Sequence, residues 1–359
     1  MRMRYLFFTN TPAHVHLYRH AIERLQAEGH DVLVLGRDYG CTHALLDYHD
    51  LPYRIYGKCE TTMFSLFREL PGQYLEIFRQ TRRYDPDLIF GVGSYAAHAG
   101  AMSRTPVVVV ADSEPTTFDH VASRPFVDTF LTPHTFGKDL GANHYEFRGF
   151  KELAYLHPDV YEPDPTIRDR LGVEQDEEYA IVRFNAFGSH HDVGHSGFSP
   201  EKRRKLIAAL SEHVTVFVSD EGGNPAPGDS YEFDLHPALL HDALAEASLL
   251  VADTQTMVTE AALLGTPAIR SNSFVGESDM GNFIELEREG LIYNFREFDD
   301  VLSQALTTIS DDSAKRRLRE RRDEYLADKV NLTDVIVDVA RTAVVPQQRI
   351  ERTVAVSHR

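Results

Sequence analysis

Segment 252–269 reads ADTQTMVTEAALLGTPAI and contains a complete strand–turn–helix–strand pattern. Apolar residues run up to Asp253, small hydroxyl residues open a helix predicted over 256–264, and Pro267 begins another strand. Free backbone N–H groups in the first turn of such a helix, together with its dipole, form an anion site suited to phosphate. Glu260 lies about one and a half turns further along, within reach of a ribose. The segment therefore predicts a nucleotide site, against the plainer alternative of a capped helix with a surface glutamate.

The same alternation extends in both directions from this segment. The second half of the chain contains the strand-like runs YAIVRF, VTVFVSD, LLVAD, PAIRS and LIYNF, separated by helical segments such as SPEKRRKLIAALSEH and HPALLHDALAEA. The first half contains MRYLFFT, DVLVLGR, YRIYG, DLIFGVG, PVVVVAD, TFLTP and HYEFRG, again with helical stretches between them. Strands that alternate with helices predict parallel sheets covered on both faces. We therefore predict an α/β protein with two doubly wound, Rossmann-like domains that face each other across a cleft.

Chain length and local composition predict the domain boundaries. A chain of 359 residues suggests two domains of ordinary size. Residues 151–178 are rich in Pro, Asp and Glu and lack a strand-like run, so we expect them to cross between the domains. This leaves an N-terminal domain at 1–150, a C-terminal domain with additional helices at 179–345, and a flexible tail at 346–359.

Composition narrows the class of protein. Asp and Glu outnumber Lys and Arg by 55 to 37, and the resulting formal charge of −18 disfavours a nucleic-acid binder. The acidic residues are spread along the chain, a pattern that resembles proteins of salt-loving archaea. Cys41 and Cys59 provide neither a disulfide framework nor a metal site. No window is apolar enough to cross a bilayer, and MRMRYLFFTN does not read as a signal peptide, so we expect a cytoplasmic protein.

Polar loops follow the predicted strands, at the edge where ligands bind in parallel sheets. The loops are 10–14, 91–95, 112–115, 189–197, 220–223, 253–257 and 271–274. Several of them contain glycine, namely 91–95, 189–197 and 220–223. We expect the catalytic and binding residues to lie among them.

The loop SHHDVGHSG, 189–197, packs three histidines and an aspartate into a short stretch. It can be interpreted as a metal site, a catalytic cluster or a polar loop that holds a ligand. His191 and His195 are four residues apart, but Gly194 between them disfavours a helix that presents both on one face. We therefore predict no metal here, and expect His190, His191 or His195 to contact a diphosphate or sugar.

The hydroxyl-rich turn followed by TEAALLGTPAI resembles the nucleotide-binding segment of GT-B enzymes, the superfamily of UDP-sugar glycosyltransferases and non-hydrolysing UDP-N-acetylglucosamine 2-epimerases. NTPAHVHLYRHAIERLQAEGHDV, FKELAYLHP, RFNAFGSHHDVGHSGFS, TMVTEAALLGTPAIRSNSF and GLIYNF resemble, more closely, an archaeal and bacterial family of GT-B-like proteins described as predicted glycosyltransferases. The resemblance spans about residues 3–310. It implies a GT-B fold, with the acceptor on the N-terminal domain and the nucleotide sugar on the C-terminal domain.

The resemblance also implies roles for individual residues. Glu260 matches a glutamate that binds ribose, and 254–256 stands where the epimerases have a Ser-Gly-Gly turn over the diphosphate, here without its glycines. His14 falls where several GT-B transferases place a general-base histidine, with Asp112 or Glu114 as an alternative base or orienter. SHHDVGHSG stands where the epimerases carry a functional histidine in a Gly-His-Arg-Arg run. This chain lacks the arginine pair of that run.

The complete set of predicted site residues has two groups. The predicted catalytic residues are His14, Asp112, Glu114 and His191. The predicted nucleotide-sugar-binding residues are Asp253, Thr254, Gln255, Thr256, Met257, Glu260, Ser189, His190, His195, Glu221 and Asn272. No metal ligand and no cofactor are predicted, because helix-start donors and protonatable histidines can stabilise a departing diphosphate.

These residues predict a metal-independent glycosyltransferase that uses a nucleotide-activated sugar in cell-surface glycan or glycoconjugate synthesis. Two alternatives stay open: a UDP-sugar 2-epimerase-like enzyme and a non-catalytic sugar-nucleotide-binding protein. The acceptor is a glycan or a lipid-linked molecule. Segment 61–83 alternates Phe, Leu and Tyr with Arg and is interpreted as a core-facing helix, with peripheral membrane contact as the alternative. The basic run 315–329 is interpreted as a solvated helix face.

Overall fold

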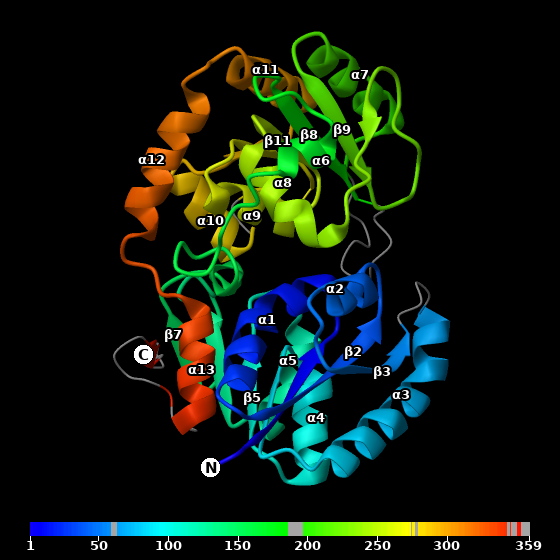
Figure 1. Cartoon of the computed structure of the whole chain (residues 1–359), viewed down its shortest axis with the longest axis vertical. Helices are drawn as coiled ribbons and strands as arrows, with labels where there is room; N and C mark the ends of the chain where they lie inside the picture. The colour runs from blue at the N-terminus through cyan, green and yellow to red at the C-terminus, as the bar shows by residue number, and fades with distance from the viewer. Residues whose placement is uncertain are drawn as a thin grey trace. The chain divides into compact units, whose positions relative to one another are not determined.

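The computed structural model describes residues 1–58, 63–185, 197–273, 275–276, 279–342, 345 and 350–352. The chain divides into two compact units (Figure 1). Unit 1 contains Met1–Tyr161 and Asp328–Arg359, and unit 2 contains Glu162–Ala327. The chain therefore leaves unit 1 once and returns to it near its C-terminus.

Unit 1 is built on one mostly parallel sheet. Its strands are β1 (Arg4–Thr9), β2 (Asp31–Asp38), β3 (Tyr53–Lys58), β4 (Leu88–Gly91), β5 (Val107–Val110), β6 (Thr129–Pro133), β7 (His144–Phe147) and β14 (Ile350–Arg352). Their order is β14-β7-β6-β5-β4-β1-β2-β3, and all neighbours are parallel except β14, which pairs antiparallel with β7. The order reverses direction between β1 and β4, as doubly wound sheets do.

Helices cover both faces of this sheet. They are α1 (Pro12–Ala27), α2 (Thr42–Tyr48), α3 (Met63–Tyr84), α4 (Ser94–Ser103), α5 (Thr117–Ser123), α13 (Leu332–Thr342) and the 3₁₀ helices η1 (Arg124–Phe126) and η2 (Lys151–Ala154). Alternate side chains of β1 explain the two layers. Leu6 and Phe8 belong to the core shared with α3 and α4, whereas the Phe7 ring packs on Tyr18 of α1 and the Tyr5 hydroxyl donates to the carbonyl of Ala340 in α13 at 3.0 Å.

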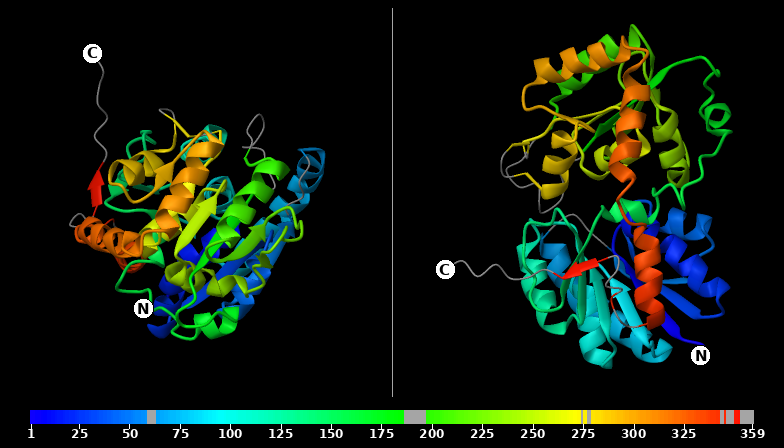
Figure 2. Two further views of the ribbon diagram at one scale, coloured as in Figure 1. Left: turned by 90° about the horizontal axis from the view of Figure 1, so that it is seen from above. Right: turned by 90° about the vertical axis from the view of Figure 1, so that its left-hand side faces the viewer.

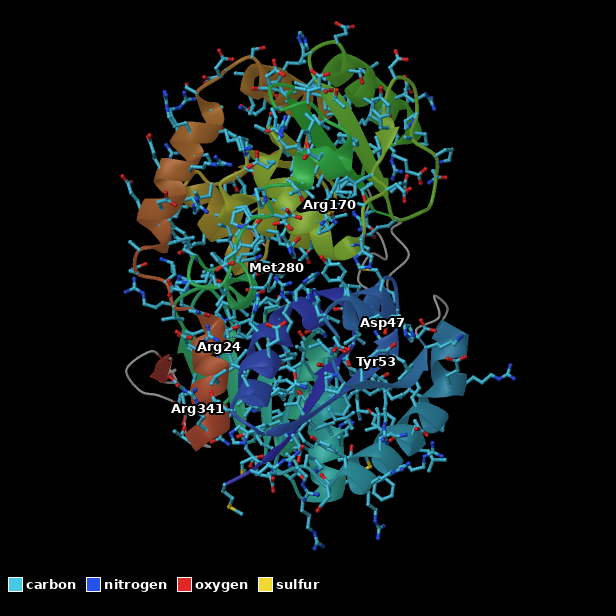
Figure 3. All side chains as sticks on the ribbon, in the orientation of Figure 1. Arg24, Asp47, Tyr53, Arg170, Met280 and Arg341 are labelled. Carbon is cyan, nitrogen blue, oxygen red and sulfur yellow. The ribbon has the colours of Figure 1, made fainter. Side chains whose placement is uncertain are left out.

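Helix α13 lies beside α1 although about 300 residues separate them in sequence (Figures 1 and 3). Its apolar face is buried, and ion pairs flank the contact: Arg24 of α1 with Asp334, and Arg341 with Glu28. From sequence this helix was assigned to the second domain. That assignment is wrong, because its apolar stripe packs on α1 in unit 1.

Unit 2 contains a second, fully parallel sheet. Its strands are β8 (Tyr179–Phe184), β9 (Thr215–Asp220), β10 (Tyr231–Glu232), β11 (Leu249–Ala252), β12 (Ala268–Arg270) and β13 (Tyr293–Asn294). The order is β10-β9-β8-β11-β12-β13, so the direction of winding reverses between β8 and β11.

The helices of unit 2 also form two layers. They are α6 (Ile167–Leu171), α7 (Pro200–Ser211), α8 (Leu240–Glu246), α9 (Thr256–Leu264), α10 (Gly281–Arg288), α11 (Phe298–Ile309), α12 (Ala314–Leu326) and the 3₁₀ helix η3 (Pro237–Leu239). Val182 and Phe184 of β8 pack against α7 and α11. Tyr179 of the same strand donates to a carbonyl of α8, which packs beside α9 on the opposite face.

The predicted crossing and the predicted tail each contain short elements. The predicted crossing 151–178 contains η2 in unit 1 and α6 in unit 2. The predicted tail contains β14, which adds an edge strand beside β7 (Figure 2). The other residues of the tail lie outside the described residues.

Candidate functional site

The points where the strand order reverses locate a candidate site in each unit. Ligands of open α/β sheets bind at these points, beyond the carboxyl ends of the strands. In unit 1 the loops after β1 and β4 meet there, and in unit 2 Asn185, directly after β8, meets the turn after β11. The predicted residues Asp253 to Met257 follow β11, and His14 follows β1.

The turn between β11 and α9 presents unpartnered donors. The backbone N–H groups of 254–257 donate to no other described residue, and the Gln255 side chain does not cap the helix. Thr254 is only 8% exposed, and its hydroxyl group is buried. This hydroxyl has no hydrogen-bond partner in the described part of the chain. Four N–H groups and a hydroxyl at a helix N-terminus form an arrangement that can bind a phosphate.

Asp253 connects this turn to the loop after β8. Its carboxylate accepts hydrogen bonds from the backbone N–H groups of Asn185 at 2.6 Å and Phe198 at 3.1 Å. Burial raises the pKa of Asp253 to about 6, although these two N–H groups and the charge of Arg203 favour its ionised form. The residue predicted to bind nucleotide therefore holds protein backbone with both carboxylate oxygens.

Arg203 of α7 binds the carbonyl groups of the same two residues, Asn185 and Phe198. It donates to the carbonyl oxygens of Phe198 at 3.0 Å and Asn185 at 3.2 Å, and pairs with Asp220 at 2.8 Å. Together Asp253 and Arg203 clamp the two ends of the segment that contains SHHDVGHSG. Sequence reasoning missed Arg203, because α7 reads as an amphipathic helix in which an arginine is expected on the solvent face.

The predicted residues in the histidine loop are outside the part of the chain that the structure describes; they are Ser189, His190, His191 and His195. Their contacts with a ligand stay predictions. In the described remainder of the chain, no group of three or more His, Cys, Asp or Glu side chains is arranged to hold a metal ion.

Glu260, predicted to bind ribose, is buried inside unit 2. Its residue is 3% exposed, and its Oε1 lies 3.0 Å from Nε2 of His241, which is itself 2% exposed. The plainer alternative, a surface glutamate, is wrong, because α8 covers that face of α9 and supplies the histidine. Ribose binding by Glu260 stays a prediction.

Two further predicted residues are close to the clamp. Asn272 donates from Nδ2 to the carbonyl oxygen of Asp253 at 3.1 Å, so it supports the turn after β11. Glu221 pairs with Arg183 at 2.7 Å and is near enough to Asp253 to raise its pKa slightly. Met257 is buried at 6% exposure and contributes to the helix core.

In unit 1, Asn10 joins the loops at the reversal point. Its side chain accepts from the Tyr56 hydroxyl at 2.9 Å and donates to the carbonyl oxygen of Val92 at 3.1 Å. Its carbonyl accepts from Nε of Arg37 at 3.2 Å, and its N–H donates to Nδ1 of His14 at 3.2 Å. A polar residue directly after a buried strand is the signal that could have marked Asn10 as a site residue.

His14 is buried and neutral. Burial, together with the nearby cations Lys151 and Arg37, lowers its pKa to about 3, although the charge of Asp112 partly opposes them. Because Nδ1 accepts a hydrogen bond from Asn10, the proton of the neutral ring lies on Nε2. His14 therefore presents a donor at Nε2, which argues against the general-base role predicted from sequence.

The predicted acids Asp112 and Glu114 follow β5. Asp112 forms an ion pair with Lys151, whose Nζ also lies 3.8 Å from Glu152. The carbonyl oxygen of Glu114 accepts from Nζ of Lys138. Sequence reasoning assigned no role to Lys151, although it stands in the motif FKELAYLHP.

Helix α3 has an exposed face that bears on the question of membrane contact. A hollow of about 510 Å³ runs along it, lined in part by Leu75, Phe78, Arg79, Arg82 and Arg83. Leu75 is 68% exposed. The described helices include none that is long and apolar enough to cross a membrane. Ile77 of the same helix is buried in the core of unit 1, and peripheral membrane contact stays the alternative interpretation of this segment.

Solved structures of an epimerase and of glycosyltransferases share this fold. The chain is similar to UDP-GlcNAc 2-epimerase from Neisseria meningitidis bound to UDP-GlcNAc, with a TM-score of 0.67 and 11% identity, over 94% of this chain and 100% of that chain. It is also similar to spinosyn rhamnosyltransferase SpnG, with a TM-score of 0.62 and 14% identity, over 95% of this chain and 100% of that chain. Two parallel α/β sheets of this kind confirm the predicted GT-B class of fold.

Sequence comparison gives a relative and a family. The chain is 23% identical over 278 residues to the uncharacterized protein MJ0665 of Methanocaldococcus jannaschii, which covers 73% of this chain and 79% of that protein. A family model described as "Protein of unknown function (DUF354)" matches residues 4–341. Because this match spans nearly the whole chain, the protein belongs to the DUF354 family.

Proposed function

We propose that the protein is a metal-independent glycosyltransferase that takes its sugar from a nucleotide sugar, in the synthesis of cell-surface glycans or glycoconjugates. One observation carries the proposal. In the turn before α9, the backbone N–H groups and the buried hydroxyl of Thr254 have no hydrogen-bond partner among the described residues. This turn lies where the strand order of unit 2 reverses. A diphosphate fits such donors because they need no rearrangement to receive its charge.

The role of unit 2 is to hold the nucleotide and to stabilise the departing diphosphate. Thr254, Gln255, Thr256 and Met257 supply the donors of the first helical turn. Asp253 and Arg203 fix both ends of the histidine loop beside it, so we keep His190, His191 and His195 as predicted diphosphate or sugar contacts. Support for a sugar nucleotide also comes from the similar structures, one of them an epimerase bound to UDP-GlcNAc.

The role of unit 1 is to bind and activate the acceptor. Transfer needs a base that removes a proton from the acceptor hydroxyl. Since the Nε2 of His14 carries a proton, we assign His14 to hydrogen-bond donation and leave the base to the carboxylate of Asp112 or Glu114. The acceptor is a glycan or a lipid-linked molecule.

Nucleotide-sugar binding to the full-length protein tests the proposal. UDP-, GDP-, dTDP- and CMP-sugars are screened by thermal shift at low and high salt, and the hit is measured by calorimetry. Thr254→Val keeps the shape of the side chain and removes the hydroxyl, so we expect the dissociation constant to rise about tenfold. Thr307→Val, an exposed threonine of α11, is the matched control and should bind as the wild type does.

Two results would reject the nucleotide site: no nucleotide sugar stabilises the protein, or Thr254→Val binds with unchanged affinity. Product analysis then separates the reactions. Transfer of the sugar to an added acceptor supports the transferase. Conversion of the sugar nucleotide to its epimer without acceptor identifies the epimerase-like alternative, and binding without turnover identifies the non-catalytic one.

A further inference from the structure

Arg37, near the carboxyl end of β2, is held in a fixed orientation. Its Nε donates to the carbonyl oxygen of Asn10 at 3.2 Å. Its guanidinium carbon lies 5.9 Å from the ring centroids of both Tyr39 and Tyr95, so two aromatic rings are within cation–π distance of the charge. These contacts restrict the side chain while they use only one of its five N–H donors.

The two terminal amino groups of Arg37 make no hydrogen bond and no ion pair with a described residue. Other partly buried arginines differ in this respect: Arg183 pairs with Glu221, and Arg203 pairs with Asp220. Arg37 is thus partly buried without a described anionic partner, in a chain whose formal charge is −18. A guanidinium that is anchored through Nε and has no described partner for its terminal groups can recognise a phosphate or carboxylate with two parallel hydrogen bonds.

Two further donors are close to Arg37. Arg37 and Lys151 both act electrostatically on His14, so the three groups gather at the carboxyl edge of the unit 1 sheet. Asp112 compensates the charge of Lys151 but not that of Arg37. The Nε2 proton of His14 adds a neutral donor, with no partner among the described residues. Asp112 and Glu152 both lie beside Lys151, so the guanidinium of Arg37 is the cation of this edge without a described anionic partner.

We propose that Arg37, with the Nε2 proton of His14 and the ammonium group of Lys151, forms a binding site in unit 1 for a phosphate or carboxylate group of a substrate. The assignment of that substrate to sugar transfer rests on the proposed function. The anion then belongs either to an acidic acceptor or to the diphosphate of the nucleotide sugar. The anion site itself stands on the geometry of Arg37.

Histidine-ring NMR spectra of the full-length protein, titrated with inorganic phosphate, test this site locally. The His14 signal is assigned through its loss in His14→Gln. We expect phosphate to shift this signal in a saturable way, and Arg37→Gln to raise the dissociation constant about tenfold. Arg82→Gln, an exposed arginine of α3 without a described partner, should leave it unchanged.

The proposal fails if the His14 signal does not respond to phosphate, or responds equally in Arg37→Gln. Repeating the titration with saturating UDP separates the two sources of the anion. Loss of the phosphate response assigns the site to the nucleotide diphosphate, and a retained response assigns it to an acidic acceptor. Failure of the proposed function has another signature, because UDP then does not bind at all while the Arg37-dependent response to phosphate persists.

Discussion

Two strand-to-helix turns, one after β4 and one after β11, stand at the reversal points of their sheets but differ in how their donors are used. In the turn after β4, Ser94 donates to Oδ1 of Asp119 from its N–H at 3.1 Å and from its hydroxyl at 2.6 Å. A Cβ on Gly93, whose φ is 91°, would lie 2.2 Å from the same carboxylate. The protein's own carboxylate therefore occupies the place of an anion. At the turn after β11, no carboxylate of a described residue accepts from the N–H groups of 254–257.

This difference shows that glycine content does not identify the phosphate site in this chain. GVGS, 91–94, has the composition of a phosphate-binding loop, but its glycine makes room for Asp119. DTQT, 253–256, has no glycine, and the N–H groups of 254–256 donate to no described residue. An acid that is 25 residues away in sequence decides which turn is open, and only the fold brings it there.

The largest effect is expected in the helix that follows the open turn. Glu260→Ala removes a buried carboxylate and leaves His241 without this partner, so the free energy of unfolding should fall by about 3 kcal/mol. Glu260→Gln keeps an oxygen that can accept from His241 and should cost about 1 kcal/mol. Urea denaturation measures both variants.

This pair of variants also determines how ribose binding should be tested. A loss of nucleotide affinity in Glu260→Ala has two explanations, local unfolding or a lost ribose contact. A loss in Glu260→Gln, at nearly normal stability, would support the ribose contact. Equal stability of Glu260→Ala and wild type would show that the pair with His241 contributes nothing, contrary to our expectation.

The clamp at the open turn should give the next largest effect. Asp253→Ala leaves the N–H groups of Asn185 and Phe198 without their acceptor, while it also removes the cost of a buried charge. We expect a net loss of about 2 kcal/mol in the free energy of unfolding. Asp299→Ala, at an exposed ion pair of unit 2, is the control and should change stability little. Equal losses in the two variants would contradict the clamp.

The same carboxylate should make stability depend on pH. Burial raises the pKa of Asp253 to about 6, above its unfolded value, so the folded state takes up this proton first as the pH falls. The resulting stabilisation is complete below the unfolded pKa and is lost as the pH rises through 6. From pH 7 to pH 5, wild type should gain about 1 kcal/mol relative to Asp253→Asn. Parallel stability curves for the two proteins would contradict the raised pKa.

The fold could be predicted from sequence because its determinants are local. Runs such as VVVV in β5 and TFLTP in β6 are buried on both faces, and the helices between strands carry apolar stripes. The placement of α13 could not be predicted in this way. Its stripe of Val335, Ile336 and Val339 indicates a buried face but not the sheet that buries it.

The candidate site was predictable only in part. The turn after β11 has a sequence pattern of its own, so Thr254 could be selected. Arg37 and Arg203 depend on contacts between distant segments, and an arginine that binds a carbonyl has the same sequence signature as one in solvent. The tautomer of His14 is set by a backbone N–H four residues earlier, which no residue pattern encodes.

The smallest effect is expected when the closed turn is opened. Asp119→Ala removes the acceptor of Ser94, and loss of such a cap should cost between about 0.5 and 1 kcal/mol in the free energy of unfolding. The freed donors of α4 then resemble those of α9, so inorganic phosphate should restore part of the lost stability in Asp119→Ala. Chemical denaturation with and without phosphate measures this, with Asp299→Ala as the control. If phosphate stabilises Asp119→Ala no more than the control, free donors at a reversal point are insufficient for anion binding, and the buried hydroxyl of Thr254 becomes the feature that distinguishes the turn before α9.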